Sequence, residues 1–301
     1  MHRSILIGFL ALASLVVSST NVSALSYMYV PEKVRLMAAD LVVVGKMNDV
    51  KQVQQSITGT LTITKTLRGD AKMKTAAMSW RDMSRFGGGK GHRNGQAGIW
   101  LLKKGRDGKY ATGYPGNFVA IDQLKRVEQG LKEIDQLKWV ESNGLELTCI
   151  TEMRKIGPGR AGLNPGQAQP VASLAIYSFV RNASKKAISV YDNQNDKIMG
   201  LTLVTPSGGE RIVDLYPRFN PKMKLHARMF HTLEPGKMRA LGYGQHVRDI
   251  TQAGTHVMKL SYQNKHDGKA LDVKDVWTGK INLKPIKIAT PGSEKKAAAG
   301  S

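Results

Sequence analysis

The chain of 301 residues carries 45 Lys and Arg side chains against 23 Asp and Glu, a formal net charge of +22. Its one cysteine, Cys149, excludes a fold held by internal disulfides, so hydrophobic cores must stabilise it. The charge excess favours polyanionic or acidic partners, because it raises their local concentration. The alternative is a solvated surface without a ligand, since the basic residues are scattered along the chain.

The N-terminus has the pattern of a secretory signal peptide. Basic Arg3 precedes an apolar run over 5–17, and small residues follow at 22–24. We therefore expect residues 1–24 to be removed near Ala24 and the mature protein to be secreted or periplasmic. The run is shorter than the roughly 20 residues that span a bilayer, and no later segment is long and apolar enough, so no transmembrane segment is expected.

Residues 39–70 have the pattern of a β-hairpin that follows a weakly amphipathic helical segment at 32–38. Residues 41–44 form an apolar, β-branched run, and residues 60–67 alternate threonine with apolar side chains. This period of two is typical of a strand with one buried and one solvated face. Lys65 falls on the apolar face, which indicates a sheet edge or a barrel mouth.

A loop dense in glycine and basic residues is expected at 81–95, after a third strand at 73–80. Its backbone N–H groups and cations would suit an anion. It matches neither nucleotide-binding fingerprint, GxxxxGK[ST] or GxGxxG, so a mobile connecting loop is the alternative interpretation. The candidate binding residues in this loop are Arg85, Lys90, His92 and Arg93.

A helix is expected at 121–141, after a buried strand at 98–102 and a turn at 104–108. The apolar period changes there from two to three or four, which is typical of an amphipathic helix packed on a sheet. The residues with this spacing are Ile121, Leu124, Val127, Leu131, Ile134 and Leu137.

The segments 39–46, 61–69 and 98–102, followed by the closing helix, resemble the netrin-like domain of tissue inhibitors of metalloproteinases and of many bacterial exported proteins. This resemblance implies an OB-like β-barrel over 25–141 with one C-terminal helix. In the animal inhibitors an N-terminal cysteine chelates the metal of the target. The chain has no cysteine near residue 25, so protease inhibition is an alternative function with no residue attached to it.

The second half is expected to be a separate, mainly β domain. Glycine and proline punctuate residues 142–170, which predicts a linker that leaves the angle between the domains free. Residues 147–150 look like a short half-buried strand with Cys149 as a small apolar residue. Short strands separated by turns over 171–288 favour an antiparallel β-sandwich. Residues 233–236, 253–262 and 277–279 resemble the late strands of bacterial immunoglobulin-like modules, although His256 and Met258 stand where that fold has its corner tyrosine and second cysteine. A polar tail, predicted to be disordered, follows at 289–301.

No catalytic or metal-binding motif emerges. The histidines 226, 231, 246, 256 and 266 lack the short spacing of a zinc site and are expected on the surface or in turns. Residues 192–196 lack the glycine and glutamate of a calcium loop and are expected to form a turn. No nucleophile lies in a glycine-flanked elbow, and no cofactor is implied.

The sequence therefore predicts an exported, non-enzymatic binding protein. Its partner would be a polyanion (an acidic polysaccharide, a nucleic acid or a wall polymer) or an acidic protein. A hydrolase with a site between the domains is the other alternative. A second candidate binding surface, besides the 81–95 loop, is formed by Lys280, Lys284 and Lys287.

Overall fold

The computed structural model describes residues 30–53, 56–81, 91–105, 107–112, 117–155, 172–193, 196–215 and 224–290. In this part the protein is mainly β. The predicted signal peptide, the loop residues Arg85 and Lys90, and nearly all of the predicted tail lie outside it.

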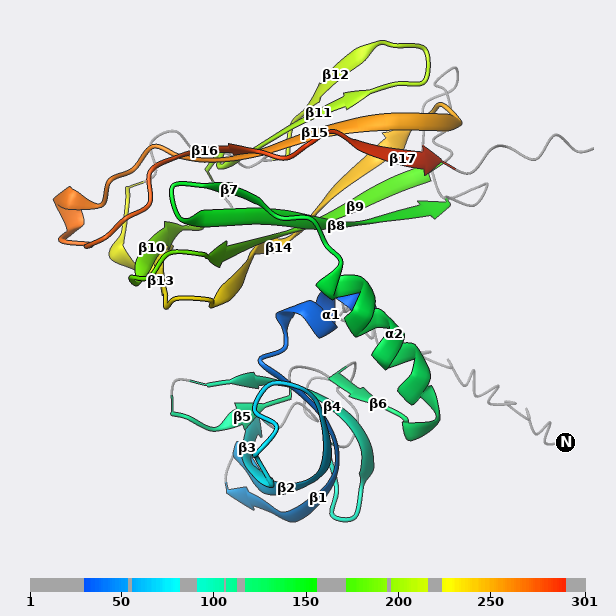
Figure 1. The fold of residues 1–301 in the computed structure, drawn as a ribbon, viewed down its shortest axis with the longest axis vertical. Helices are drawn as coiled ribbons and strands as arrows, with labels where there is room; N and C mark the ends of the chain where they lie inside the picture. Colours follow the sequence, from blue (N-terminus) through cyan, green and yellow to red (C-terminus); the bar gives the residue numbers. More distant parts are fainter. Residues whose placement is uncertain are drawn as a thin grey trace, which may run out of the picture.

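A closed five-stranded barrel forms the first half (Figure 1). Its strand order is β1-β2-β3-β5-β4, and β1 closes the barrel by pairing with β4. The β3–β5 pair is parallel, and the others are antiparallel. The short β6 pairs with β4. The bounds of these strands are β1 (Leu41–Val53), β2 (Ser56–Arg68), β3 (Thr75–Arg81), β4 (Ala97–Lys104), β5 (Tyr110–Ala111) and β6 (Phe118–Val119).

The barrel interior is filled by alternate side chains of its strands, as the period of two predicts. The buried members of this interior cluster are Leu41, Val43, Met47, Leu61, Ile63, Ala76, Met78, Trp100 and Leu102. The alternation breaks beside Val44, where the register shifts and leaves Thr64 with no paired residue on β1. This bulge turns Lys65 outward, where it forms an ion pair with Glu128 at 2.7 Å.

Two helices flank the barrel: α1 (Glu32–Ala38), where one was predicted, and α2 (Leu124–Asp135). A 3-10 turn at Ile121–Gln123 precedes α2. The prediction of one helix up to residue 141 is wrong at its C-terminal end. The last helical hydrogen bonds are those from the Gln136 N–H to Lys132 O and from the Leu137 N–H to Ile134 O. The chain then turns away from the helix and enters β7 at Val140.

Two facing sheets form the second half. One has the order β14-β9-β8-β7; the other has the order β12-β11-β15-β16, with β17 also paired to β15, and β10 and β13 form a separate pair. The bounds are β7 (Val140–Ser142), β8 (Leu145–Lys155), β9 (Ala172–Asn182), β10 (Ile188–Tyr191), β11 (Met199–Val204), β12 (Glu210–Val213), β13 (Phe230–Leu233), β14 (Met238–Ile250), β15 (Gly254–Asn264), β16 (Gly279–Asn282) and β17 (Ile286–Thr290).

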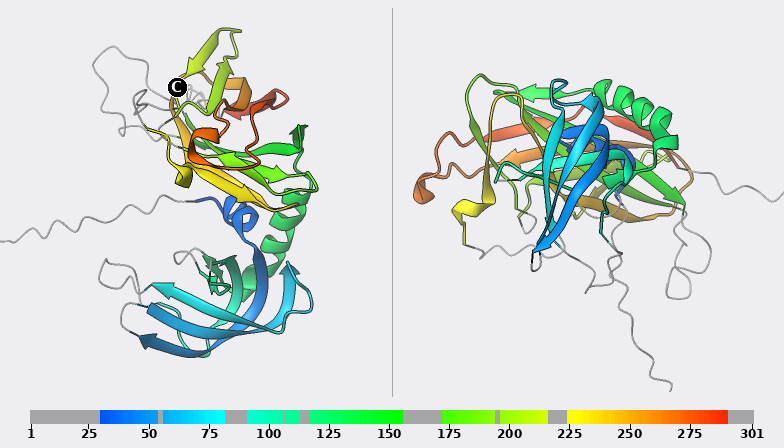
Figure 2. Two further views of the ribbon diagram at one scale, coloured as in Figure 1. Left: turned by 90° about the vertical axis from the view of Figure 1, so that its left-hand side faces the viewer. Right: turned by 90° about the horizontal axis from the view of Figure 1, so that it is seen from below.

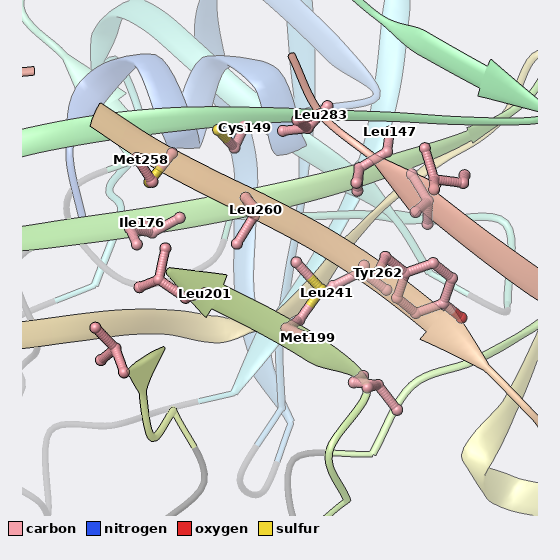
Figure 3. Packing of buried hydrophobic residues seen from close by; sticks show 14 of the residues in the cluster. Leu147, Cys149, Ile176, Met199, Leu201, Leu241, Met258, Leu260, Tyr262 and Leu283 are labelled. Carbon is pink, nitrogen blue, oxygen red and sulfur yellow. The ribbon is translucent and has the colours of Figure 1, made fainter. Parts of the chain in front are cut away.

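One hydrophobic cluster fills the space between these sheets (Figure 3). Leu147 and Ile176 come from the first sheet, and Leu201 and Leu260 from the second. Cys149 on β8 lies in the same cluster, and its burial raises the pKa of its thiol to about 12. The thiol is therefore protonated at neutral pH, and Cys149 serves as a small apolar residue here.

The range 142–170, predicted as a linker, contains a long strand, which confirms the short strand predicted at 147–150 and extends it in both directions. β8 occupies Leu145–Lys155 and pairs along its whole length with β9, so the two-sheet half begins at β7 rather than at residue 171. The glycine and proline residues that suggested a linker lie between 157 and 166, outside the described residues. At the other end, β17 reaches Thr290, two residues into the predicted tail.

The two halves share a buried apolar cluster, with α1 and α2 lying between them (Figures 1 and 2). Leu36 and Val127 of the helices pack with Ile99 of the barrel and with Tyr177 and Phe179 of β9. β9 is therefore buried on both faces, one toward the second sheet and one toward the helices. This packing replaces the expected free angle between the domains with an apolar contact.

Candidate functional site

The predicted anion-binding loop joins β3 to β4 at one end of the barrel. Only its last residues are described, and they extend the pairing of β1. The Gly95 N–H donates to Met47 O at 2.8 Å, and the Met47 N–H donates to Gln96 O at 2.9 Å. The Val50 N–H donates to the side-chain oxygen of Asn94 at 2.7 Å. These bonds hold the exposed Arg93 beside the last part of β1.

His92 is half-buried in an aromatic cluster at this end. Its ring centroid lies 5.5 Å from that of Trp80, 4.7 Å from Trp100 and 6.1 Å from Phe118. Burial lowers the pKa of His92 below its ordinary value, opposed by its hydrogen bond with Gln96. His92 therefore anchors the loop as a neutral ring and adds no positive charge to the surface at neutral pH.

The hydrogen bonds of His92 define its tautomer. Gln96 Oε1 lies 3.3 Å from Nδ1 and also accepts the Arg93 N–H at 3.2 Å, so it acts as an acceptor. Nδ1 therefore donates the proton, and Nε2 accepts from the Thr112 hydroxyl at 2.9 Å. Beside this network, Trp80 Nε1 is buried without a hydrogen-bond partner among the described residues.

Lys46, Lys51 and Arg93 are the exposed cations around this part of the barrel. Within the residues that the structure describes, no carboxylate forms an ion pair with any of the three. Asp49 is also exposed and has a φ of 53°, inside the bulge that separates Lys51 from Asn48 in the register. Because of the extra residues in this bulge, Lys51 points to the outside of the barrel, as Lys46 and Asn48 do before it.

The outward face of β1, β2 and β3 carries small polar side chains in three cross-strand rows, which we call the barrel face. Met47, Leu61 and Met78 point inward, so their neighbours in sequence point outward. The pairing registers align the rows as Lys46–Thr62–Thr75, Asn48–Thr60–Ala77 and Lys51–Thr58–Ser79. Within the face, Asn48 Nδ2 donates to Thr62 Oγ1 at 2.9 Å.

Lys280, Lys284 and Lys287 are exposed, as predicted, but they belong to the two-sheet half. Lys280 pairs with Gln263 and Lys287 with Val257 along β15. These β15 positions are six residues apart, which places Lys280 and Lys287 about 20 Å from each other. The structure therefore brings these lysines neither into one compact cluster nor next to the barrel loop.

A polar network that sequence reasoning missed lies in the two-sheet half. Asp196 Oδ2 accepts from the Tyr191 hydroxyl and from His266 Nε2, each at 2.9 Å. Burial opposes ionisation of Asp196, but these donors and the Lys197 N–H hold its pKa below the ordinary value. His266 is 70 positions from Asp196, so no local spacing could have revealed the pair.

A second acidic residue of the same turn anchors another bond network. Arg239 donates from Nε to Asp192 Oδ2 at 3.1 Å, and its Nη2 lies 3.1 Å from His231 Nε2. Asp192 and Asp196, at the two ends of the turn expected at 192–196, thus each hold side chains from elsewhere in the two-sheet half. In the described part of the chain, no group of three or more His, Cys, Asp and Glu side chains is arranged to hold a metal ion.

His256 does not lie on the surface or in a turn, and that prediction is wrong. It is on the inner face of β15 and only 2% exposed, because Thr255 and Val257 occupy the outward positions of this strand. Burial lowers its pKa, opposed by a hydrogen bond with the Gly254 backbone.

Neither a protein-family model nor a curated protein sequence matches the chain. Among the described residues, no helix has both the length and the apolar character that crossing a membrane requires.

Proposed function

We propose that the protein is a non-enzymatic binding protein whose barrel holds a polyanion. The observation that carries this proposal is the group of exposed cations Lys46, Lys51 and Arg93, which have no ion-pair partner among the described residues. Cations without carboxylate partners keep their full attraction for an incoming anion. The net charge of +22 adds a long-range attraction of the same sign.

The strand order supports assigning the barrel to the OB type. A three-strand meander, a parallel β3–β5 pair and closure through β1–β4 give a five-stranded Greek-key barrel. Barrels of this type bind oligonucleotides and oligosaccharides. The α1 and α2 helices, which pack together in the shared cluster, are compatible with the netrin-like resemblance.

The pairing order also supports the immunoglobulin-like assignment of the two-sheet half. Strands early and late in the sequence, β9 and β14, are neighbours in one sheet, while β11 and β15 are neighbours in the other. Such crossing connections are typical of Greek-key sandwiches. The fold by itself implies no activity.

The boundary between the halves favours a binding protein over a hydrolase with an inter-domain site. Apolar side chains, among them Leu36, Val127 and Phe179, fill the described part of this boundary. We propose that the protein acts outside the cytoplasm, on the basis of the signal-peptide pattern at 1–24.

Charge reversal at two places tests the site. The variant K46E/K51E/R93E should lose most binding to a polyanion panel of duplex DNA and a sulfated polysaccharide. For DNA, the slope of log K against log salt should become shallower by about 0.9 for each phosphate that the variant no longer neutralises.

The matched control is K280E/K284E/K287E, which changes the net charge by the same amount. It should retain the binding and the salt slope of the unmodified protein. Equally weakened binding in both variants would mean that only overall charge matters, and weakening confined to the control would move the site to β16 and β17.

A further inference from the structure

The barrel face is the open part of the barrel's outer surface. Near the start of β1, this surface is covered: Val42 lies in the cluster shared with the helices, and Arg68 donates to Leu36 O of α1 at 3.1 Å. Farther along the strands the cover ends, and Thr62, Thr75 and Ala77 are exposed. Figure 1 shows the β1–β2 hairpin on the side of the barrel away from α1 and α2.

Hydroxyl groups occupy five of the nine positions on the face, and one of them, that of Thr62, already accepts from Asn48. Thr58, Thr60 and Thr62 stand two residues apart on β2, and Ser79 and Thr75 continue the outer rows on β3. In a sheet this arrangement repeats about every 6.7 Å along a strand and about 4.8 Å between strands. Because the threonines are β-branched and stiff at χ1, their hydroxyls lose little freedom when a ligand binds.

The chemistry of the face favours one class of polyanion. Single-stranded nucleic acids bind through aromatic side chains on which their bases stack. The three rows contain no aromatic residue, while Trp80, Trp100 and Phe118 are turned toward His92. Hydroxyls that donate and accept, with Lys46 and Lys51 along one side, match a chain that is rich in both hydroxyl and anionic groups.

We propose that the polyanion is an acidic polysaccharide, which lies along the barrel face with its sugar hydroxyls on the threonine rows and its carboxylate or sulfate groups on Lys46 and Lys51. This inference rests on the proposed polyanion-binding function and narrows it to one class of ligand.

The test uses the full chain and three probes, polygalacturonate, inorganic polyphosphate and poly(dT), at one low salt concentration. The protein should bind polygalacturonate more tightly than poly(dT). The variant T58V/T60V should weaken polygalacturonate binding about tenfold, because it removes hydrogen bonds to the ligand. It should weaken polyphosphate binding less, because polyphosphate has no hydroxyl groups along its chain to donate to the threonines. Among the described residues, neither hydroxyl hydrogen-bonds to another group of the fold, so the variant should fold.

Two controls separate the hydroxyl effect from a change in folding. T58S/T60S retains the hydroxyls and should restore the binding of polygalacturonate. T202V makes the same substitution on β11, in the two-sheet half, and should have no effect on any probe; thermal unfolding checks that all variants are folded.

The outcomes distinguish this inference from the function it rests on. If no probe binds even at low salt, both proposals fail. If all three probes bind equally well per charge and T58V/T60V behaves like the unmodified protein, polyanion binding stands and the polysaccharide assignment is overturned. Tighter binding of poly(dT) would overturn it in favour of a nucleic acid.

Discussion

The barrel and the two-sheet half use their polar side chains in different ways. The barrel displays threonines on an open face beside Lys46 and Lys51, which form no ion pair within the described residues, whereas several buried or half-buried polar groups of the two-sheet half bind one another. Asp196 is held by Tyr191 and His266, and Asp192 by Arg239. A polar group that is already satisfied inside the protein has little to offer a ligand. The comparison therefore supports the proposal that the barrel recognises the ligand and that the two-sheet half supports the barrel.

The largest expected effect on stability comes from disrupting the apolar cluster that joins the two halves. Phe179 is fully buried there, so F179A should lower the free energy of unfolding by about 3–5 kcal/mol. Because both halves pack on this cluster, urea unfolding should remain one transition that shifts to lower urea.

The control for this variant is I212A. Ile212 lies on the edge strand β12 and is 85% exposed, so its truncation should change stability by no more than about 0.5 kcal/mol. Two separate transitions in the unmodified protein would show that the halves are energetically independent despite the shared cluster.

A smaller effect is expected from the polar network of the two-sheet half. Y191F removes the hydroxyl that donates to Asp196 and accepts from Asn193, which should cost about 1–2 kcal/mol. The pKa of Asp196 lies below its ordinary value of 3.8, so its contribution is complete above pH 3.8 and disappears as the pH falls through the lower folded-state pKa.

Urea unfolding at neutral and acidic pH checks this prediction. Y110F, on β5 of the barrel, is the matched substitution and should be nearly neutral. Equal destabilisation by the two substitutions would remove the distinction between the halves.

The smallest effect concerns His92 in the barrel. Its folded-state pKa lies below 6.5, so the folded state binds this proton less readily than the unfolded state. The stabilisation that the neutral His92 ring gives the folded state is therefore complete above pH 6.5 and is lost as the pH falls toward the folded-state pKa. H92Q should flatten the dependence of the unfolding free energy on pH in this range, and a slope that does not change would mean that His92 is not the titrating group.

Several elements could be predicted from the sequence because local periodicity encodes them. The alternation of threonine with Leu61 and Ile63 placed β2 and its outward rows, and the three-to-four spacing of Val127, Leu131 and Ile134 placed α2. The sequence also located Arg93 and His92 in one loop. It could not show that Arg93 stays exposed while His92 is half-buried, because the burial of His92 depends on Trp80 and Phe118, which come from other parts of the barrel.

Tertiary structure alone decided the features that depend on distant partners. The bulge at Thr64 exists because β2 must follow the register of β1, and it reverses the face predicted for Lys65. β8 extends beyond the short strand predicted at 147–150 because β9 pairs with it from end to end. Distant partners also decide three other features: the end of α2, the burial of His256 and the bond between His266 and Asp196. Periodicity in the sequence shows which side of a helix or strand is apolar. Pairing register and packing between remote segments decide which residues that side contacts.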